Sequence, residues 1–343
     1  MKFRITVFTL AFVLIVSTMA TPALAEVTRG TAGSMGYTQT TGNLGGANYV
    51  IRIPDEWNGN LIVGCHAYFI DRDPNQQFQF DDLAAKFIAK GYAYAASDYG
   101  ALGYCVNAGF NQTYELTRYV ISQYNVTGRV VLFGGSMGGQ IALLLGEKYP
   151  NIYCGVLDIC GPKDLVTMYN DGTYIAGATL EQIRAFYGWP ATVPADSTVQ
   201  FFKDFAARSG VDLIAETGGS PTAVPQAYEK ISPLNHANIS IPVISLVGTK
   251  DYIVQLSQTQ AYQNAITTAG HSENYTMIIV EGGGHLDAIT MAQASTALEL
   301  LIAIAIPEIP TFVLLLSILA VATILLIAKK KLLGKANLHT IHL

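Results

Sequence analysis

The sequence predicts an α/β fold, in which a mostly parallel sheet carries helices on both faces. Between residues 26 and about 306, short apolar runs of strand length alternate with longer amphipathic stretches. This alternation is typical of βαβ units. The same region contains neither an internal repeat nor a low-complexity linker. Of the 343 residues, 50% are hydrophobic and only 13% are charged, which excludes an intrinsically disordered chain.

The predicted elements follow one another in the order that βαβ units require. Each predicted helix is longer than the strands beside it and ends near a helix-stopping residue, as Gly91 and Pro150 illustrate. The predicted strands are residues 48–53, 60–63, 93–96, 130–134, 155–159, 242–247 and 275–280. The predicted helices are residues 83–90, 114–124, 137–149, 256–268 and 287–303.

The alternation breaks once, between about residues 163 and 238. This stretch is rich in Tyr, Phe, Thr and Pro and contains two helix-like segments, residues 180–186 and 199–207. We interpret it as an insertion on top of the sheet, which is either a cap over an active site or a small structural subdomain. Its aromatic residues favour an apolar or aromatic substrate group, unless they form the core of the insertion itself: Tyr169, Tyr174, Phe186, Tyr187, Trp189, Phe201 and Phe202.

The strongest motif is Gly134-Gly135-Ser136-Met137-Gly138, a G-x-S-x-G sequence between an apolar strand and an amphipathic helix. In this context the turn holds the serine in a strained conformation that lifts its hydroxyl above the sheet. The small glycines let the helix and the strand approach each other. A phosphate-binding P-loop is excluded because no G-K-[ST] sequence follows. We expect Ser136 to be a nucleophile.

A serine nucleophile needs a base, and the base needs an acid. His285 follows the strand at 275–280 and a Gly-rich loop, and Asp251 follows the strand at 242–247. These positions favour His285 as the base and Asp251 as the acid, although a lone Asp there would be more often a cap or turn residue. The other histidines lie before a strand, in a polar turn or in the tail: His236, His271, His339 and His342.

An oxyanion formed at this site needs two N–H donors. The first expected donor is the backbone N–H of Met137, the residue after the nucleophile. The second expected donor is the backbone N–H of Tyr68, in the loop after the strand at 60–63, with Ala67 as the neighbouring candidate. We expect His66 to be a structural hydrogen-bonding residue.

Taken together, residues 48–303 resemble the α/β-hydrolase superfamily. The order Ser136, Asp251, His285 is the order of that superfamily. Residues 57–63 are similar to the lead-in of exported esterases and lipases, and residues 91–100 to the fourth strand and its loop. Residues 232–235, ahead of the strand that leads to Asp251, are similar to prolyl-oligopeptidase-like hydrolases.

The resemblance implies a serine hydrolase that cleaves carboxylic esters through an acyl-enzyme, with no metal and no organic cofactor. The expected partner is a small-molecule or peptide substrate. A nucleic-acid partner is not expected, because no basic stripe supplies phosphate contacts. Two alternatives stay open: a serine peptidase of the prolyl-oligopeptidase-like type, and a non-catalytic surface module on the same fold. A long-chain prolyl oligopeptidase is excluded because the sequence contains no propeller domain.

Residues 1–25 are expected to be a signal peptide. Lys2 and Arg4 precede an apolar run at residues 5–16, and Ala23 and Ala25 form an A-x-A cleavage pattern. The mature chain would then begin near residue 26. The alternative is an uncleaved membrane anchor, for which the apolar run is short.

Residues 307–343 are expected to be a sorting or transmembrane segment with a basic tail. The apolar run at 312–328 is at the lower length limit for a bilayer span and is followed by Lys329, Lys330 and Lys331. Under the positive-inside rule these lysines stay cytoplasmic, so the body of the protein is exported. The alternative is a buried core helix.

The five residues that precede this run, Pro307-Glu308-Ile309-Pro310-Thr311, resemble the PEF-CTERM sorting signals of archaeal surface proteins. The family pattern has Phe where this chain has Ile309. The resemblance implies processing by an archaeosortase. With a retained span or with a replacement anchor, the expected location is the outer face of the cell membrane or the cell surface.

Four cysteines and four sequons bear on an exported location. The absence of a CxxC pair gives no support for a zinc ribbon. A disulfide between Cys65 and Cys105 is one possibility, because both residues follow strands expected to be neighbours. The other possibility is that the cysteines are free buried thiols. Residues Asn111, Asn125, Asn238 and Asn274 begin Asn-x-Ser/Thr triplets that permit glycosylation.

Overall fold

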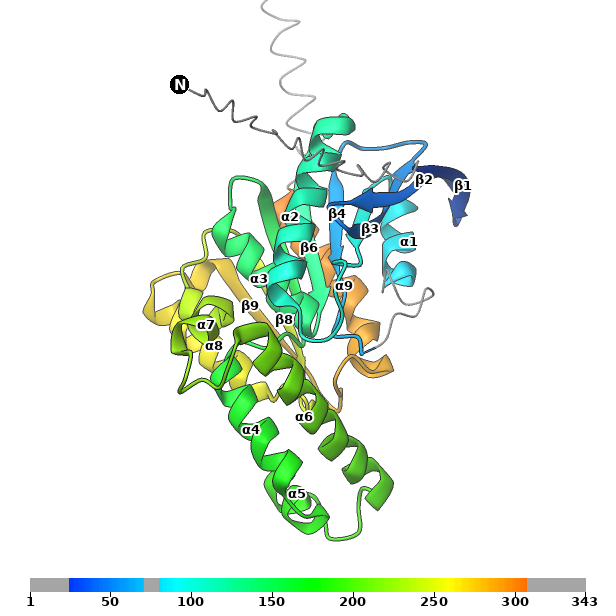
Figure 1. Cartoon of the computed structure of the whole chain (residues 1–343). Coiled ribbons are helices and arrows are strands. Elements are labelled where there is room, and N and C mark those ends of the chain that lie inside the picture. The colour runs from blue at the N-terminus through cyan, green and yellow to red at the C-terminus, as the bar shows by residue number, and fades with distance from the viewer. Residues whose placement is uncertain (1–24, 71–79, 307–343) are drawn as a thin grey trace, which may run out of the picture.

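A computed structural model describes residues 25–70 and 80–306 of the chain. They form a nine-stranded sheet in the order β1-β2-β3-β5-β4-β6-β7-β8-β9, with helices on both faces (Figure 1). The first three strands and β5 pair antiparallel, and every pair from β5 through β4 to β9 is parallel. The predicted α/β fold is therefore confirmed. The leader and the C-terminal segment expected from the sequence lie outside the described residues.

The strands are short, and those in the middle of the sheet are buried along their whole length. Their bounds are β1 Glu26–Ala32, β2 Met35–Leu44, β3 Ala47–Pro54, β4 Leu61–Cys65, β5 Ala93–Ser97, β6 Val130–Gly135, β7 Tyr153–Ile159, β8 Val243–Gly248 and β9 Tyr275–Val280.

The helices fall into two groups, those that cover the sheet and those of the insertion. The first group is α1 Asp81–Ile88, α2 Val106–Gln123, α3 Met137–Lys148, α8 Leu256–Thr268 and α9 Ala288–Ala305. The second group is α4 Leu165–Gly177, α5 Leu180–Tyr187, α6 Asp196–Thr217 and α7 Pro225–Ile231, followed by a short 3₁₀ turn at Pro233–His236.

The hairpin β1–β2 and the first part of α2 form structure that the pattern did not predict, as do α4 and α7 in the insertion. The hairpin of β1 and β2 is built from Thr, Gly and Gln residues that are mostly exposed or half-buried, so it shows no alternation of apolar and polar residues. Helix α2 begins at Val106 rather than near residue 114. Gly109 in its first turns has no Cβ, and a Cβ there would lie 2.4 Å from the Ile141 side chain. The glycine therefore serves close helix packing and does not end the helix.

Alternate residues of β6 pack into two separate apolar cores, one on each face of the sheet. Val130 and Leu132 belong to the core under α2, α3 and α8. Val131 and Phe133 belong to the core under α1 and α9. A strand that is buried on both faces is expected for a parallel sheet that carries helices on both sides.

Helix α9 is long and apolar enough to cross a membrane, with a mean hydropathy of 1.6 over 18 residues. Within the described chain, however, it packs on β7 and β8, and Leu298 and Leu301 are fully buried. A buried core helix passes the same test of length and composition. We therefore assign α9 to the core of the sheet.

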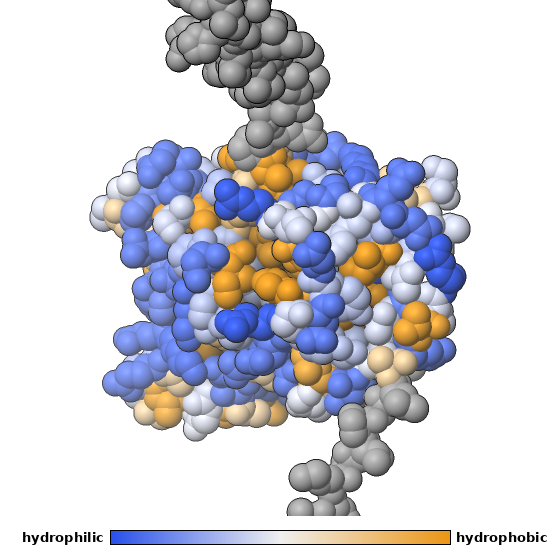
Figure 2. Space-filling view, turned by 90° about the horizontal axis from the view of Figure 1, so that it is seen from above, coloured by the Kyte–Doolittle hydropathy of each residue, from blue (hydrophilic) through white to orange (hydrophobic). Residues whose placement is uncertain are grey.

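The insertion forms a helical cap at one end of the molecule. Figure 1 shows α4, α5 and α6 projecting beyond the sheet. The cap has a small apolar core of its own, formed by Ile175, Ala178, Ile183, Val199 and Ala206. Figure 2 looks onto the opposite end of the molecule, where hydrophilic side chains surround smaller apolar areas.

All four cysteines are free thiols in the structure. The disulfide considered for Cys65 and Cys105 is therefore not formed. Both residues belong to the same apolar core, and burial raises the pKa of each thiol to about 12. These are protonated, packed side chains, which is the usual state of buried free cysteine.

Candidate active site

Ser136 lies on the sharp turn between β6 and α3, with φ 52° and ψ −125°. A residue other than Gly pays for such a conformation and keeps it only where its surroundings hold it. The Ser136 N–H donates to the Ile159 carbonyl of β7 at 2.8 Å. A Cβ on Gly134 would lie 2.2 Å from the Gly138 oxygen, and one on Gly138 would lie 2.1 Å from the Cys65 oxygen. Both glycines of the motif are therefore required by space.

The three predicted residues meet in one chain of hydrogen bonds. His285 Nε2 lies 2.9 Å from Ser136 Oγ, and His285 Nδ1 lies 2.8 Å from Asp251 Oδ2. The other carboxylate oxygen of Asp251 accepts the backbone N–H groups of Ile253 at 3.0 Å and Val254 at 2.8 Å. An ionised carboxylate only accepts, so Nδ1 carries the proton and Nε2 accepts the serine hydroxyl. This arrangement suits a general base facing a nucleophile.

The three side chains differ in the fraction of their surface that is exposed. The Asp251 side chain is 0% exposed and the His285 side chain is 13% exposed, while Ser136 is 9% exposed. The acid is thus removed from water, and the imidazole and hydroxyl lie at the edge of the protein interior. Low local dielectric strengthens the ion pair that forms when His285 takes a proton.

The two loops that carry Asp251 and His285 are fastened to each other. The Lys250 N–H donates to the Gly283 carbonyl at 2.8 Å, and the Gly282 N–H donates to Thr249 Oγ1 at 2.9 Å. A Cβ on Gly248 would lie 2.2 Å from the Gly283 oxygen. The distance between the acid and the base therefore depends on backbone contacts and on one glycine.

Cys160 joins this group, although it was not among the residues expected at the site. Ligand atoms of Cys160, Asp251 and His285 all lie within 4.8 Å of one another. Burial, followed by the Asp251 charge, raises the pKa of the Cys160 thiol. Both imidazole nitrogens of His285 already have hydrogen-bond partners. The donor set therefore fits a protonated thiol beside a hydrogen-bonded triad better than a metal site, which needs a thiolate and a free imidazole nitrogen.

A buried ion pair lies under the site, at the start of the cap. Lys163 Nζ lies 2.6 Å from Asp158 Oδ2, and the two side chains are 1% and 0% exposed. Ser245 Oγ of β8 donates to the same carboxylate oxygen at 2.6 Å, and the Gly161 N–H donates to Oδ1 at 2.8 Å. Such a pair fixes the position of the groups around it. The only sequence signal was an Asp within an otherwise apolar strand.

The two expected oxyanion donors lie on elements that touch each other. Met137 is the first residue of α3 and is fully buried. Tyr68 follows β4, and its hydroxyl donates to Asp212 Oδ2 of the cap helix α6 at 2.6 Å. Gly138 lies against the carbonyl oxygens of Cys65 and His66. The segment that leads to Tyr68 therefore packs against the N-terminus of α3, where N–H groups have no partner in the helix.

His66 is a structural residue, as the sequence indicated. Its ring stacks between Phe69 at 4.8 Å and Tyr99 at 3.8 Å between ring centroids. Burial lowers the pKa of the His66 imidazole from 6.5 to about 4. The ring is therefore neutral near pH 7 and packs between two aromatic rings.

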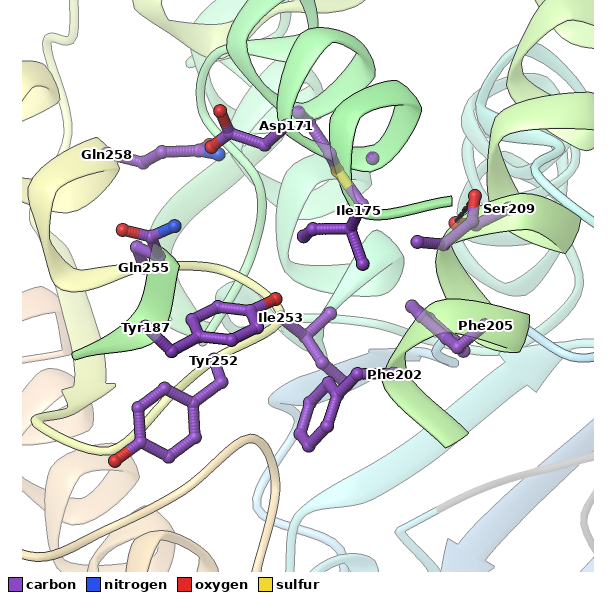
Figure 3. A pocket seen from close by; sticks show the side chains of 13 residues that line it. Asp171, Ile175, Tyr187, Phe202, Phe205, Ser209, Tyr252, Ile253, Gln255 and Gln258 are labelled. Carbon is purple, nitrogen blue, oxygen red and sulfur yellow. Dashed lines mark hydrogen bonds between the residues drawn. The ribbon is translucent and has the colours of Figure 1, made fainter. Parts of the chain in front are cut away.

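A pocket of about 470 Å³, including the part open to solvent, lies between the cap and the loop after Asp251 (Figure 3). It is lined by residues of α4, α5 and α6 and by the segment 252–258. Tyr252 in its wall directly follows Asp251, and Phe205 in its opposite wall contacts the ring of Tyr68 at 5.8 Å. The pocket is therefore bordered by the loop of the acid, and one of its wall residues, Phe205, contacts the residue expected to supply an oxyanion donor.

The architecture and this site define a hydrolase of the α/β class, in which a nucleophile turn follows a central parallel strand. A family profile described as "Alpha/beta hydrolase family" matches residues 61–298. The chain belongs to this family, and its fold is the α/β-hydrolase fold. A search of curated proteins gave no match.

Solved structures share the fold at low sequence identity. An esterase of Pyrococcus furiosus is 14% identical with a TM-score of 0.53, over 81% of this chain and 90% of that one. The rice cell wall degrading esterase LipA of Xanthomonas oryzae is 15% identical with a TM-score of 0.56, over 82% and 97%. A puromycin hydrolase is 17% identical with a TM-score of 0.54, but this chain covers only 39% of it.

Proposed function

We propose that this protein is a serine hydrolase that cleaves carboxylic esters through an acyl-enzyme. The observation that carries the proposal is the continuous hydrogen-bonded chain from Ser136 through His285 to the buried Asp251. A serine in this relation to an imidazole and a carboxylate is an activated nucleophile. No metal or organic cofactor takes part in the reaction.

Each residue has a defined step in this reaction. His285 Nε2 removes the Ser136 proton while Oγ attacks the ester carbonyl, and Asp251 stabilises the resulting imidazolium. The Met137 and Tyr68 backbone N–H groups bind the oxyanion. His285 then protonates the leaving alcohol. A water molecule, deprotonated by the same nitrogen, releases the carboxylic acid from Ser136.

We also propose that the hydrolase is exported and tethered to the outer face of the cell membrane or to the cell surface. The support is in the sequence: the leader pattern at 1–25, and the apolar run at 312–328 followed by lysines at 329–331. Archaeosortase processing is the implied route to a replacement anchor. Helix α9 starts three residues after His285 and has 18 residues, so its end lies about 27 Å from its start. A tether that follows α9 leaves the cap accessible.

A serine peptidase is the second candidate. Residues 232–235 are similar to prolyl-oligopeptidase-like hydrolases, and prolyl endopeptidases share the fold at 12% identity with a TM-score of 0.54. The same triad cleaves amides when the pocket holds the leaving amine. A non-catalytic module is disfavoured by the intact hydrogen-bonded triad.

The test combines labelling by a fluorophosphonate with hydrolysis of a chain-length series of p-nitrophenyl acyl esters. Replacing Ser136→Ala should abolish labelling and reduce kcat by a factor on the order of 10⁶, the loss expected for a triad nucleophile. The matched control Ser122→Ala changes an exposed serine of α2 and should keep both activities.

The possible results separate the candidates. Hydrolysis that survives Ser136→Ala contradicts the proposal. Labelling without ester turnover indicates the peptidase or a narrow substrate range. The absence of both labelling and turnover in the unaltered protein indicates a binding module.

A further inference from the structure

Among the residues that the structure describes, Asp171 is the only charged one that lines the pocket between the cap and the acid loop. It lies on α4 and is half-buried. Within the described chain it forms no hydrogen bond and no ion pair, and none of the lining residues is basic. A carboxylate left without a counter-charge in a partly desolvated pocket is unfavourable until a cation joins it.

The wall opposite Asp171 is aromatic. The ring of Tyr187 lies 5.3 Å from the ring of Tyr252 and 5.7 Å from the ring of Phe202, between centroids. Figure 3 shows these side chains around the lower part of the pocket, with Asp171 above them. Aromatic faces attract organic cations through their quadrupole, most strongly where water is excluded. A carboxylate above aromatic rings is thus a complementary site for an ammonium group.

The electrostatics of the pocket connect it to the triad. Burial, followed by the charge of Asp164, raises the pKa of the Asp171 carboxyl. After burial, the charges of Asp171 and Asp251 both raise the pKa of Tyr187. The Tyr187 hydroxyl therefore lies within electrostatic reach of both carboxylates, and Tyr252, which directly follows Asp251, lines the same pocket.

We propose that this pocket binds an ammonium group of the substrate, so that the ester cleaved at Ser136 is one that carries an organic amine. The inference rests on the proposed hydrolase function and narrows its substrate class. Asp171 pairs with the amine, and the rings of Tyr187, Tyr252 and Phe202 contact the carbon atoms beside it. Asp171 is a specificity residue in this proposal and takes no part in bond cleavage.

The test uses pairs of p-nitrophenyl esters in which a protonated amine replaces a methyl group of the same size. The pairs are 4-(aminomethyl)benzoate with 4-ethylbenzoate, and 6-aminohexanoate with heptanoate. The unaltered protein should prefer the amine of at least one pair by tenfold or more in kcat/KM, the range expected for a hydrogen bond to a charged group.

The variant Asp171→Asn keeps the shape of the side chain and removes its charge. It should lower kcat/KM for the preferred amine ester by tenfold or more and leave the neutral partner within about twofold, a difference that a merely structural role would not produce. The control Glu181→Gln removes an exposed carboxylate at the start of α5 and should change neither ester.

A binding measurement tests the site separately from catalysis. Trp189 lies 4.6 Å from Tyr187 and 4.8 Å from Tyr252 between ring centroids, so its fluorescence should respond to an occupant. Benzylammonium should change it and benzyl alcohol should not, and Asp171→Asn should abolish the difference.

Two results would overturn the inference: no preference for either amine ester, or an equal loss for both members of a pair in Asp171→Asn. If the protein neither hydrolyses the neutral esters nor takes a fluorophosphonate label, the proposed function fails. In that case the fluorescence titration alone decides whether the pocket binds ammonium groups.

Discussion

At the scale of single residues, the structure shows why the reactive groups could be predicted and their supports could not. Ser136, Asp251 and His285 each follow a strand, and their order along the chain is the order typical of the α/β-hydrolase fold. Cys160 and Asp171 are recognisable only once distant segments are brought together. The loop after β8 places Asp251 beside Cys160, and no local sequence pattern predicts that contact.

At the residue scale, we predict that His66 makes the stability of the fold sensitive to acid. Burial holds the pKa of this imidazole at about 4 instead of 6.5. Between these pH values the unfolded chain binds the proton more readily than the folded one, so the free energy of unfolding rises with pH. The contribution of His66 to stability is therefore lost as the pH falls from 6.5 to 4. The full difference is roughly 3 kcal/mol, at 1.36 kcal/mol per pKa unit.

Urea unfolding at pH 7 and pH 5 measures this effect. The variant His66→Gln carries no titratable group at this position and should show a smaller loss of stability between the two pH values. Other groups that titrate in this range are shared by both proteins and cancel in the comparison. Equal losses in both proteins would contradict the assignment of a buried neutral imidazole.

At the scale of elements, the sequence predicts those whose apolar residues follow the period of the element. The strands β3 to β9 all lie within about two residues of their predicted positions, because their side chains are buried in the sheet. The hairpin β1–β2 lacks that pattern, since it lies at the edge of the sheet and exposes much of its surface. In the cap, α4 and α7 were not predicted, because each buries only two residues, Leu165 and Ile175 in α4 and Tyr228 and Ile231 in α7.

The approach of α3 to β4 gives an element-scale prediction. A Cβ on Gly138 would lie 2.1 Å from the Cys65 carbonyl oxygen, and this atom is backbone that cannot rotate away. Gly138→Ala should therefore push α3 from the segment that leads to Tyr68. We expect a loss of about 1–3 kcal/mol in the free energy of unfolding, the usual cost of overpacking, and a slower fluorophosphonate reaction among the molecules that remain folded.

Gly210→Ala is the matched control for this substitution. Gly210 lies inside α6, and a Cβ there would meet nothing within 4 Å. An alanine at such a position should stabilise the helix by about 0.5–1 kcal/mol. Denaturant unfolding compares the two variants. An equal change in the free energy of unfolding in both variants would show that a Cβ at Gly138 does not disturb the contact between α3 and Cys65.

At the scale of the whole molecule, the outer part of the cap has an apolar core of its own, and the base of the cap is joined to the sheet by apolar packing and by polar contacts. Asp212 of α6 accepts the Tyr68 hydroxyl, and Glu216 accepts the backbone N–H of Asn107 at 2.6 Å and its side-chain amide at 2.8 Å. Burial raises the pKa of the Glu216 carboxyl. Ile175, Ile183 and Val199 belong to the separate apolar cluster of the outer cap, whereas Leu165 and Leu213 at its base belong to a cluster of the sheet. Such a division allows the cap to open while the sheet stays folded.

Two large-to-small substitutions test this division. Ile183 of the cap and Leu301 of α9 are both fully buried, so each replacement by Ala removes a comparable amount of packing and costs about 2–5 kcal/mol locally. Ile183→Ala should speed amide exchange in α5 and the start of α6 and leave the strands protected. Leu301→Ala should instead lower the stability of the sheet and speed exchange in β7 and β8. Hydrogen exchange followed by mass spectrometry resolves these segments.

Function should follow the same division. Because Ser136, Asp251 and His285 are held by the sheet and its loops, Ile183→Ala should still react with a small fluorophosphonate at nearly the unaltered rate. Its KM for esters that fill the pocket should rise, since Tyr187 in the pocket wall packs on the cap cluster and its ring contacts that of Phe202. Exchange that rises equally in the strands of Ile183→Ala would mean that the cap and the sheet unfold as one unit, and the pocket would then be as rigid as the triad beside it.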